Sequence, residues 1–506
     1  MEIDSLHLED DARQVFLAAP AAEPERQYYF MEQLHRMVGA RAEAGDTVLT
    51  YQVETFGCQM NFRDSEKMAG ILLASGFTEE NGKHPDLVLI NTCTVRENAD
   101  ERVYGHLGYL KKQKERNPEM VVVLCGCMMQ EPHVVETLKK SYGYVDLVFG
   151  THNIYKLAEL LFLMYSGRKW QLMHPVKKNG KYRVRHEMLI DIAADADLIV
   201  EELPDERKYP FKASVDITYG CDNFCTYCIV PYVRGRERSR RPEDILSEIR
   251  KLASLGVTEI MLLGQNVNSY GKQFEGVTFY GLLQEIEKID GIHRIRFMTP
   301  HPKDFPDELI DVIAASDKIC HHIHLPLQSG STEIIRRMNR HYTKESYLDL
   351  VRRIREKIPD AAITTDIIVG FPGETEEDFL DTLDVVRKAG FNGAYMFEYS
   401  KRTGTPAATM PDQVPEAVVK ERFARLMETV QEAARKDLGD LTGSVQEVLV
   451  EEVDPDRAEG VTGRLTYNTL VHFPAPEGKN PEELIGSYLP VRLVENCGFY
   501  YIGVVA

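Results

Sequence analysis

Long apolar runs are missing from this sequence. No stretch of 18 consecutive apolar residues occurs in its 506 positions, whereas a membrane-spanning helix needs about 20. The chain begins with Met1-Glu2-Ile3-Asp4, which lacks the positively charged start of a signal peptide. These two absences predict a cytoplasmic protein without membrane attachment.

Cysteine is scarce, with nine residues in the whole chain. That number is too small for a disulfide framework in a protein of this length. Most of the nine cysteines stand beside glycine in motif-like settings. Metal ligation in a reducing compartment explains such cysteines better than oxidation does.

A net positive charge is also absent, because the formal net charge is −19. This value argues against indiscriminate binding to nucleic acid. Basic residues are nevertheless clustered. Arg168–His186 holds seven Lys or Arg and no acidic residue, and Arg234–Arg241 holds five Arg and one Glu. Such runs are usually solvated faces or linkers, but beside a metal site they become candidate phosphate contacts.

The length predicts about two to four domains, since one core cannot serve so long a chain. Composition and periodicity divide the sequence into five segments. These are a weakly ordered N-terminal extension with a short helix near Tyr29–Ala40, an N-terminal parallel α/β domain, a linker with the first basic run, a second α/β domain and an all-β module. Their predicted bounds are 1–47, 48–167, 168–210, 211–438 and 439–506.

In the 48–167 segment, apolar strands alternate with helices such as Ser65–Ala74 and Val134–Lys140. This alternation implies right-handed crossovers and a parallel sheet that is covered on both faces. Strands are expected at Val48–Thr55, Leu87–Asn91, Val121–Leu124 and Val145–Phe149.

The 211–438 segment repeats a β–α unit six times, which is too few for the usual eight-fold barrel. We therefore expect an open (β/α)6 partial barrel, and the fold class is α/β. Its strands are predicted at Ala213–Thr218, Glu259–Leu263, Arg294–Met298, His322–Leu325, Ile363–Val369 and Ala394–Tyr399.

After Gly439, short alternating runs punctuated by glycine predict a small all-β barrel. Its strands are expected at Glu447–Val450, Thr469–Phe473, Pro490–Val494 and Tyr500–Val505.

Cys221, Cys225 and Cys228 place three thiolates on one tight loop directly after the apolar strand Ala213–Thr218. Three sulfurs leave a four-ligand metal site with one open position, where a reaction can take place. Three soft thiolates suit a 4Fe–4S cluster with one iron free of cysteine. The alternative is a zinc knuckle that is completed by a distant Cys or His.

Cys58, Cys93 and Cys127 each follow a predicted strand, at intervals of 35 and 34 residues. One β–α unit takes about 30 residues, so these cysteines are expected at one carboxyl edge of the sheet, where α/β folds bind ligands. Gly57 and Gly126 precede two of them and allow a bulky cluster to approach the backbone.

Two alternatives concern the same group. The three cysteines can be unrelated core residues, and Cys125 competes with Cys127 for the third place. Cys127 is preferred because Cys125 continues the apolar strand. Cys320 and Cys497 belong to no group and are interpreted as structural.

From Thr50 to Ala506 the chain resembles the radical S-adenosylmethionine (SAM) methylthiotransferases. The resemblance rests on both cysteine groups, on a C-terminal module similar to the RNA-binding TRAM domain, and on further motifs. These motifs are Leu262-Leu263-Gly264-Gln265-Asn266-Val267-Asn268-Ser269-Tyr270, His324-Leu325-Pro326-Leu327-Gln328-Ser329-Gly330 and Gly370-Phe371-Pro372-Gly373-Glu374-Thr375. Around Cys58, and from Cys221 to Arg238, the sequence most resembles the bacterial tRNA-2-methylthio-N6-dimethylallyladenosine synthase branch.

The resemblance implies two 4Fe–4S clusters and SAM as cofactors. Cys221, Cys225 and Cys228 would hold the cluster that cleaves SAM, and Cys58, Cys93 and Cys127 an auxiliary cluster that presents sulfur. No catalytic side chain is implied beyond these ligands. The residues implied to contact SAM are Tyr227, Gln265, Asn266, Gly370 and Glu374, with Gly373 in the same turn.

The implied reaction installs a methylthio group at C2 of N6-isopentenyl-adenosine next to the anticodon of tRNA. One SAM supplies the methyl group and a second supplies a 5′-deoxyadenosyl radical. The implied partners are tRNA and a low-potential electron donor of the flavodoxin or ferredoxin type, and the protein is expected to be a monomer.

Three other functions stay open at this point. The substrate can be threonylcarbamoyl-adenosine in tRNA or a ribosomal protein, or the chain can be a non-catalytic metal-binding RNA module. From Asp440 onward there are 11 acidic and four basic residues, so the C-terminal module is not expected to hold RNA mainly by charge.

Overall fold

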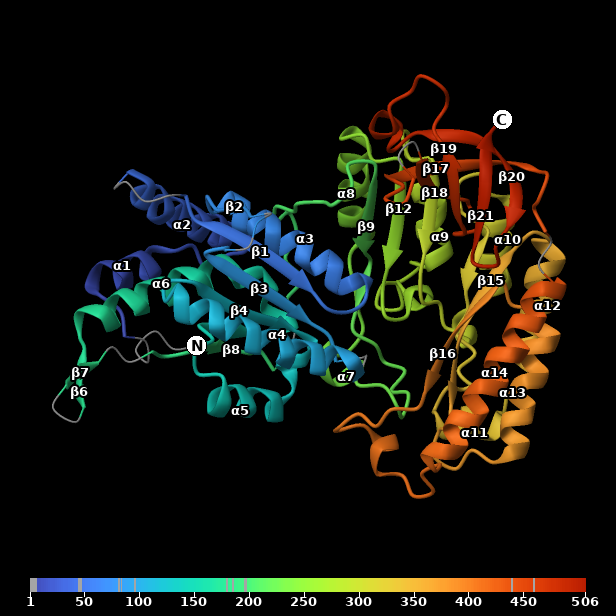
Figure 1. The fold of residues 1–506 in the computed structure, drawn as a ribbon, viewed down its shortest axis with the longest axis horizontal. Helices are drawn as coiled ribbons and strands as arrows, with labels where there is room; N and C mark the ends of the chain where they lie inside the picture. Colours follow the sequence, from blue (N-terminus) through green and yellow to red (C-terminus); the bar gives the residue numbers. More distant parts are fainter. Residues whose placement is uncertain are drawn as a thin grey trace. The chain divides into compact units, whose positions relative to one another are not determined.

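The computed structural model describes residues 7–43, 48–80, 82, 84–94, 97–178, 181–183, 186–194, 198–437, 440–457 and 460–506. The chain forms two compact units, which Figure 1 shows. Unit 1 comprises Met1–Lys208 and Ile229–Arg236, and unit 2 comprises Tyr209–Cys228 and Glu237–Ala506. The N-terminal tetrapeptide, the predicted boundary at 438–439 and four positions of the first basic run lie outside the described residues.

Unit 1 is built on a six-stranded sheet in the order β2-β1-β3-β4-β5-β8. Every neighbouring pair in it is parallel, as the sequence predicted. The strand bounds are β1 Thr50–Thr55, β2 Thr78–Glu79, β3 Leu87–Thr92, β4 Val121–Gly126, β5 Leu147–Phe149 and β8 Leu189–Asp191. The four predicted strands are present, and β2 and β8 were not predicted.

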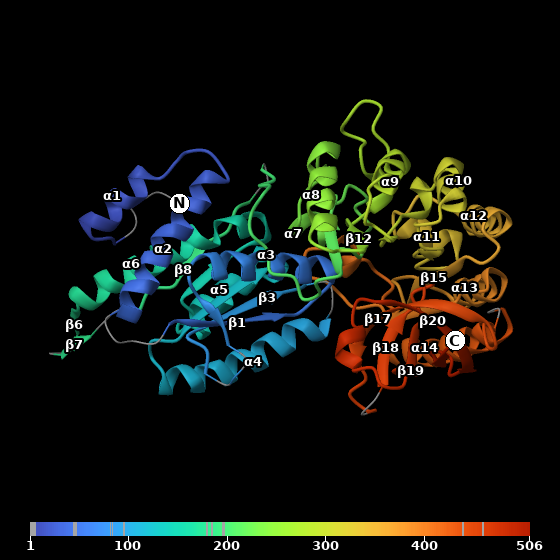
Figure 2. The ribbon, with the colours of Figure 1, turned by 90° about the horizontal axis from the view of Figure 1, so that it is seen from above.

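Both faces of this sheet are covered by helices. Side chains alternate along a strand, so Leu89 and Val123 enter the core beneath α2, α3 and α6, while Ile90 and Leu124 enter the core beneath α4 and α5. Figure 2 shows α3 and α4 on opposite sides of the strands. The helix bounds are α2 Glu25–Glu43, α3 Gln59–Ala74, α4 Glu97–Arg116, α5 Pro132–Ser141 and α6 Leu157–Met173.

The N-terminal extension is better ordered than the sequence suggested. It contains α1 (Asp10–Ala18) and the 19-residue α2. The prediction of weak order is wrong here because Phe30, Leu34 and Val38, spaced four apart, form one helix face. All three are buried in the core that α2 shares with α6.

The predicted linker, residues 168–210, also carries regular structure. It starts inside α6, continues into the hairpin of β6 (Val176–Lys178) and β7 (Lys181–Arg183), and then supplies β8. β8 pairs with β5 at the edge of the main sheet. A three-residue strand leaves no periodic signal in a sequence, which explains why it was missed.

Unit 2 begins with six parallel strands in two sheets of three. One sheet has the order β13-β12-β9 and the other β14-β15-β16, and a parallel bridge between Ile295 and Ile319 joins β13 to the segment that leads into β14. The bounds are β9 Lys212–Asp216, β12 Glu259–Leu263, β13 Arg294–Phe297, β14 His322–His324, β15 Ala362–Val369 and β16 Gly393–Glu398. All six predicted strands are present.

Among the described residues, β9 and β16 are the outer strands of this arrangement, so the partial barrel is open as predicted. A two-stranded ribbon of β10 (Thr218–Tyr219) and β11 (Arg238–Ser239) follows β9. The helices of unit 2 are α8 Pro242–Ser254, α9 Phe279–Glu287, α10 Asp307–Ala315, α11 Thr332–Arg337, α12 Lys344–Lys357, α13 Glu376–Ala389 and α14 Glu416–Asp437. Among the described residues, the short 3-10 helices are η2 Cys127–Gln130, η3 Thr151–Lys156, η4 Val267–Ser269, η5 Pro302–Asp304, η6 Pro406–Thr409 and η7 Pro481–Leu484.

The C-terminal part of unit 2 is a closed barrel in the order β17-β18-β19-β21-β20. This confirms the small all-β barrel. The strands are β17 Val445–Val453, β18 Gly460–Arg464, β19 Leu470–Pro474, β20 Tyr488–Asn496 and β21 Tyr500–Val505. β18 was not predicted because two glycines bound it. At Gly463 a Cβ atom would lie 2.4 Å from the Leu449 carbonyl oxygen of the neighbouring strand.

The closed barrel is fastened to the partial barrel by two buried arginines of β13. Arg294 donates to the carbonyl oxygens of Arg464 and Glu447, both at 2.9 Å. Arg296 donates to the carbonyl oxygens of Thr466 and Leu465 at 2.9 and 2.8 Å. The all-β module is therefore an integral part of unit 2. In the part of the chain that the structure describes, no helix is long and apolar enough to cross a membrane.

Candidate metal centres

Cys58, Cys93 and Cys127 lie at the carboxyl ends of three adjacent parallel strands. Cys93 directly follows β3 and Cys127 directly follows β4, and the last residues of these strands, Thr92 and Gly126, are paired. Cys58 stands three residues after β1 and precedes the first residue of α3. The register thus brings the three cysteines to the one sheet edge that their spacing predicted.

The backbone around these cysteines is closely packed through glycine. Gly57 has a φ of 152°, and a Cβ atom there would lie 2.7 Å from the Cβ of Cys93. Gly126 has a φ of 98°, and a Cβ atom there would lie 2.3 Å from the Thr92 carbonyl oxygen. Any larger side chain at either position would push neighbouring cysteine-bearing segments apart.

Cys125 occupies a different environment from Cys127. It is inside β4, belongs to the core beneath α2, α3 and α6, and its sulfur lies 3.6 Å from the Met68 sulfur. Burial raises the pKa of its thiol well above the usual value. Cys125 is therefore a core residue, and the structure gives no reason to prefer it as a ligand.

Burial holds the Cys127 thiol in its neutral form. Burial raises the pKa of the Cys127 thiol to about 12, against the opposing charge of Arg234, and Cys93 and Cys58 raise it further. The three sulfurs are thus near enough to repel one another as thiolates. Iron would supply the positive charge that turns such buried thiols into ligands.

Arg234 is a residue of this site that the sequence did not identify as such. Its Nε donates to the Cys127 sulfur at 3.2 Å, and its guanidinium also contacts Asp64 and Asn61. The sequence had offered Arg234 only as a phosphate contact. An arginine in a basic run gives no sign that it will be buried.

Cys221, Cys225 and Cys228 lie on the loop that follows β10. Gly220 and Phe224 adopt positive φ values of 74° and 46°, which turn the chain tightly around Cys221. The Cys228 amide donates to the Cys225 carbonyl oxygen at 2.9 Å. Burial raises the pKa of the Cys221 thiol to about 11, against an opposing hydrogen bond from the Asn223 backbone.

Within the described ranges, no group of three or more His, Cys, Asp or Glu side chains is arranged to hold one metal ion. A 4Fe–4S cluster binds each thiolate to a different iron and so needs its ligands further apart. The ligand roles of Cys221, Cys225 and Cys228 stay a prediction. Cys320 and Cys497 belong to neither group and occur as free cysteines elsewhere in unit 2.

Asn266 and Gln265 follow the carboxyl end of β12, as predicted. Asn266 is buried, its Nδ2 donates to Asp304 at 2.9 Å, and its Oδ1 has no hydrogen-bond partner. His301, which the sequence did not single out, follows the next strand. Its Nδ1 accepts from the Lys303 amide at 3.2 Å, and its buried Nε2 has no partner. Burial lowers the pKa of His301 far below its usual value, so the ring is neutral.

Asn266 and His301 together offer one hydrogen-bond acceptor and one donor. Because Nδ1 of the neutral His301 ring accepts, its proton is assigned to Nε2, which is a donor, whereas Asn266 Oδ1 is an acceptor. Buried polar atoms without partners cost about 1–3 kcal/mol each. Asn266 and His301 follow the carboxyl ends of the neighbouring strands β12 and β13. Unpartnered buried polar atoms at neighbouring strand ends are typical of a ligand site.

Tyr227 packs in a small apolar cluster with Phe371 and Met338. Its hydroxyl accepts from Arg340 at 3.2 Å, and Arg340 also lies 3.7 Å from the Cys225 sulfur. The ring is thus held beside the cysteine loop. Arg340 is a second buried arginine that the sequence did not identify.

Gly370 and Glu374 form the turn that follows β15. The Glu374 carboxylate accepts from the Gly370 amide at 3.0 Å and from Arg422 at 2.7 Å, while its second oxygen has no partner. Burial raises the pKa of Glu374 to about 7. Gly373 has a φ of 82° in the same turn. The structure gives Glu374 a turn-holding task, and its role toward SAM stays a prediction.

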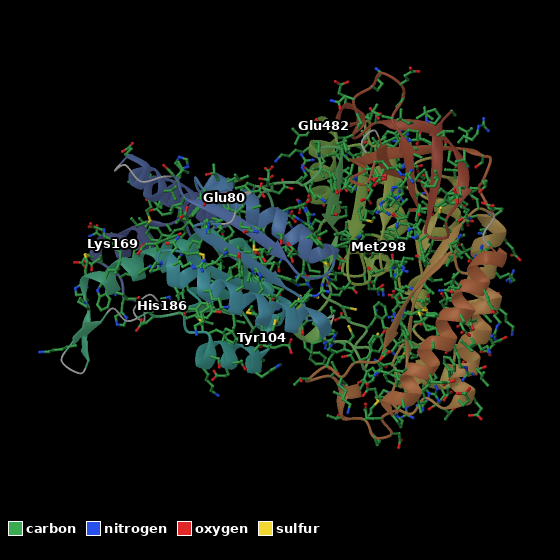
Figure 3. All side chains as sticks on the ribbon, viewed as in Figure 1. Glu80, Tyr104, Lys169, His186, Met298 and Glu482 are labelled. Atoms are coloured by element: carbon green, nitrogen blue, oxygen red, sulfur yellow. The ribbon has the colours of Figure 1, made fainter. Side chains whose placement is uncertain are left out.

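The described part of the first basic run lies away from the cysteines of unit 1. Arg168 donates to the carbonyl oxygens of Pro118 and Glu119, which precede β4, and His186 precedes β8. Figure 3 shows Lys169 and His186 at the end of unit 1 from which the strands start. The first run is therefore at the edge of the sheet opposite Cys93 and Cys127.

In the second run, Arg234 and Arg240 are buried. Arg240 pairs with Glu248 at 2.7 Å and donates to the Asp216 carbonyl oxygen, while the exposed Arg241 pairs with Asp244. Burial and acidic partners remove Arg234 and Arg240 from the candidate phosphate contacts.

Comparison with known proteins agrees with this architecture. The model of the radical SAM superfamily matches residues 215–386, and that of an uncharacterized protein family, UPF0004, matches residues 50–150. The fold and the two cysteine groups thus define a radical SAM protein with an additional N-terminal α/β domain.

Curated relatives extend over nearly the whole chain. One from Lachnoclostridium phytofermentans is 59% identical and covers 90% of this chain and 95% of its own. One from Acetivibrio thermocellus is 51% identical and covers 93% and 94%, and one from Clostridioides difficile is 45% identical and covers 96% and 98%. All three are named tRNA-2-methylthio-N(6)-dimethylallyladenosine synthase. The chain belongs to this family of methylthiotransferases.

Among solved structures, the chain resembles a radical SAM methyltransferase, TsrM, from Kitasatospora setae. In the form with cobalamin and a 4Fe–4S cluster bound, the TM-score is 0.51 at 17% identity, over 71% of this chain and 74% of that one. A second structure of the same enzyme gives 0.50 at 18% identity, over 72% and 75%. At this identity the likeness concerns the fold alone.

Proposed function

We propose that this protein is the tRNA methylthiotransferase that converts N6-isopentenyl-adenosine next to the anticodon into its 2-methylthio derivative. The observation that carries the proposal is the presence of two separate groups of three cysteines in one chain. One group stands at the ends of three parallel strands and the other on the loop after β10. The names of relatives up to 59% identical support the same substrate.

The proposed ligands of the auxiliary 4Fe–4S cluster are Cys58, Cys93 and Cys127. Those of the cluster that binds SAM are Cys221, Cys225 and Cys228. The C2–H bond of adenine is too strong for any side-chain acid or base, so two clusters held by these cysteines, together with two SAM molecules, would supply the radical, the sulfur and the methyl group. Three cysteines on each cluster leave one iron open in each.

The proposed role of the protein's side chains is to orient the bound SAM. We assign Asn266 Oδ1 to accept from the amino group of SAM, since Asp304 fixes the amide so that its oxygen stays open. His301 Nε2 is placed to donate to an anionic group of the same ligand. Tyr227 offers an apolar face, Gln265 stands next to Asn266, and Glu374 with Gly370 shapes the adjoining turn.

Three further proposals follow from the proposed function. They concern the electron donor, the cellular location and the oligomeric state. A reaction that begins with one-electron reduction needs a low-potential donor, for which a flavodoxin or ferredoxin is suited. A tRNA substrate implies a cytoplasmic enzyme. The protein is proposed to act as a monomer, because each chain by itself supplies both cysteine groups.

The alternative functions have less support. Threonylcarbamoyl-adenosine and a ribosomal protein would be modified by related chemistry, but the curated relatives cited above carry the isopentenyl-adenosine name. A non-catalytic RNA module does not need the unpartnered polar atoms of Asn266 and His301.

The decisive experiment compares Cys127→Ala with Cys125→Ala. Both change one buried cysteine, two positions apart, but only Cys127 lies past the end of β4. Each protein is reconstituted anaerobically and assayed for 5′-deoxyadenosine and for the methylthio nucleoside in tRNA by mass spectrometry. Cys127→Ala is expected to release 5′-deoxyadenosine without methylthio product, and Cys125→Ala to make both.

Full methylthio product from the Cys58→Ala/Cys93→Ala/Cys127→Ala protein would refute the auxiliary cluster. Persistence of methylthio-isopentenyl-adenosine in tRNA from a strain that lacks this gene would refute the substrate. Stoichiometric zinc in place of iron, with no spectral response to SAM, would favour the non-catalytic module.

A further inference from the structure

One buried arginine of unit 1 reaches the sulfur of a proposed cluster ligand. Arg234 ends the short helix α7 (Val230–Val233), and its side chain is almost fully buried. Its Nε donates to the Cys127 sulfur at 3.2 Å. Among the thiols of this group, Cys127 is also the one against which α7 packs, through Ile229 and Val233.

The remaining contacts of Arg234 are directed at the same site. One terminal nitrogen donates to the Asp64 carboxylate at 2.8 Å and to the Asn61 Oδ1 at 3.3 Å. The Cys58 thiol donates to the same Asn61 Oδ1 at 3.3 Å, a contact that a cluster-bound Cys58 thiolate, which has no proton, would not make. Asn61 Nδ2 donates to the Thr92 carbonyl oxygen, directly before Cys93. Arg234 and Asn61 thus form one polar network that touches or adjoins all three cysteines.

The fold of this region does not depend on the contact between Arg234 and the Cys127 sulfur. Burying a guanidinium costs several kcal/mol unless it is paired, and Asp64, itself buried, provides that pairing. The helix is held separately, because Thr151 donates to the Val233 carbonyl oxygen at 2.7 Å. The Nε contact to Cys127 therefore adds a charge-assisted hydrogen bond that the ion pair and the helix do not need.

We propose that Arg234 is a positioning residue of the auxiliary cluster: it fixes the Cys127 thiolate through Nε and raises the reduction potential of the bound cluster. Hydrogen bonds to ligand sulfur and nearby positive charge both stabilise the more reduced, more negative state of an iron–sulfur cluster. The inference rests on the proposed function, since it needs a cluster at Cys58, Cys93 and Cys127. Asp64 opposes Arg234 by partly neutralising its charge.

The second cysteine group offers a matched control. Arg340 is also buried, but its nearest approach to a ligand sulfur is 3.7 Å, to Cys225, and its other donors serve Tyr227, Tyr342 and the Pro326 carbonyl oxygen. A change of Arg340 alters a buried arginine of the same kind within unit 2. It should leave the auxiliary cluster unaffected.

The test uses the full chain with Cys221→Ala/Cys225→Ala/Cys228→Ala, so that only the auxiliary cluster can form. Arg234→Gln, Arg234→Lys, Asp64→Asn and Arg340→Gln are added singly. Iron per chain and the cluster's midpoint potential, from an EPR-monitored redox titration, are measured after anaerobic reconstitution. Arg234→Gln should shift the midpoint to more negative potential, Arg234→Lys less so, and Arg340→Gln not at all.

Asp64→Asn should shift the potential in the opposite direction, because it leaves the charge of Arg234 without its counter-charge. A purely structural role for the ion pair predicts no such opposition of sign. If Arg234→Gln does not retain iron, the shifts of Arg234→Lys and Asp64→Asn still decide the matter. Unchanged midpoints in iron-replete Arg234 and Asp64 variants would overturn the inference, whereas absence of iron from the parent triple variant would overturn the proposed cluster itself.

Discussion

Individual buried polar side chains indicate the candidate functional sites of this protein more clearly than its net charge does. Arg234 beside Cys127, Arg340 beside Cys225, and the open atoms of Asn266 and His301 all occur in water-excluded surroundings. In such surroundings a hydrogen bond or charge is screened little, so its direction matters. The exposed arginines and lysines of the basic runs lack that constraint.

A pH-dependent contribution to stability is expected from His322 at the start of β14. Its Nε2 is hydrogen-bonded to Thr364 at 3.0 Å, and burial, with help from Arg296, His324 and Arg464, lowers its pKa from 6.5 to about 3. The unfolded chain takes up this proton near pH 6.5 and the folded one does not. Stability is therefore lost as pH falls below 6.5, at about 1.4 kcal/mol per pH unit.

His322→Gln removes the titrating group, so the stability difference between wild type and variant should shrink as pH falls. Chemical denaturation of unit 2 at pH 7.5, 6 and 5 measures that difference. A constant difference across these three values would contradict the expectation.

At the scale of secondary-structure elements, the N-terminal helix α2 is part of the unit 1 core. Phe30 and Leu34 are fully buried and contact the same cluster as Leu161 of α6 and Ile71 of α3. α2 and α6 thus close one face of the sheet that carries the cysteines. Helix α2 therefore supports the cysteine-bearing edge of the sheet indirectly, by packing.

Phe30→Ala should destabilise unit 1 by about 3–5 kcal/mol, the usual cost of a cavity left by a large aromatic side chain. Leu17→Ala on α1 is the matched control, because Leu17 is 68% exposed and should change stability by less than about 0.5 kcal/mol. Hydrogen–deuterium exchange of peptides from α2, α6 and β4 reports the difference. Equal protection in the two variants would show that α2 does not contribute to this core.

At the scale of the whole molecule, the closed C-terminal barrel completes unit 2. Arg294 and Arg296 of β13 are buried and depend on four carbonyl oxygens of the barrel, those of Glu447, Arg464, Leu465 and Thr466. The barrel segment is acidic, with 11 Asp or Glu against four Lys or Arg from Asp440 onward. The barrel supplies hydrogen-bond acceptors for Arg294 and Arg296 of the partial barrel.

Deletion of residues 440–506 should therefore destabilise the partial barrel. Each guanidinium that loses its acceptors costs about 1–3 kcal/mol. The control is Phe499→Ala, which changes a side chain that is 88% exposed on the same module. Thermal unfolding and limited proteolysis of residues 209–437 distinguish the two. A deletion protein as resistant as the control would show that the barrel is an independent appendage.

The sequence predicted the main strands of both α/β domains, because apolar runs that alternate with amphipathic helices are compatible with few folds other than a parallel α/β arrangement. It also brought Cys58, Cys93 and Cys127 to one sheet edge, because parallel strands place equivalent positions together. It missed β2, β8 and β18, which are short or contain glycine. It expected a helix near Tyr29–Ala40, which α2 confirms, but in a segment that was otherwise taken as weakly ordered. Those elements depend on partners distant in sequence.

The amino-acid sequence by itself determined which residues can carry the chemistry, because the spacing of cysteines along β–α units is a local, periodic property. The tertiary structure decided which arginines are buried beside the cysteine groups and which belong to the surface. Burial and pairing of Arg234 with Asp64 and Cys127 arise from segments 170 and 107 residues apart. No local pattern encodes contacts of that range.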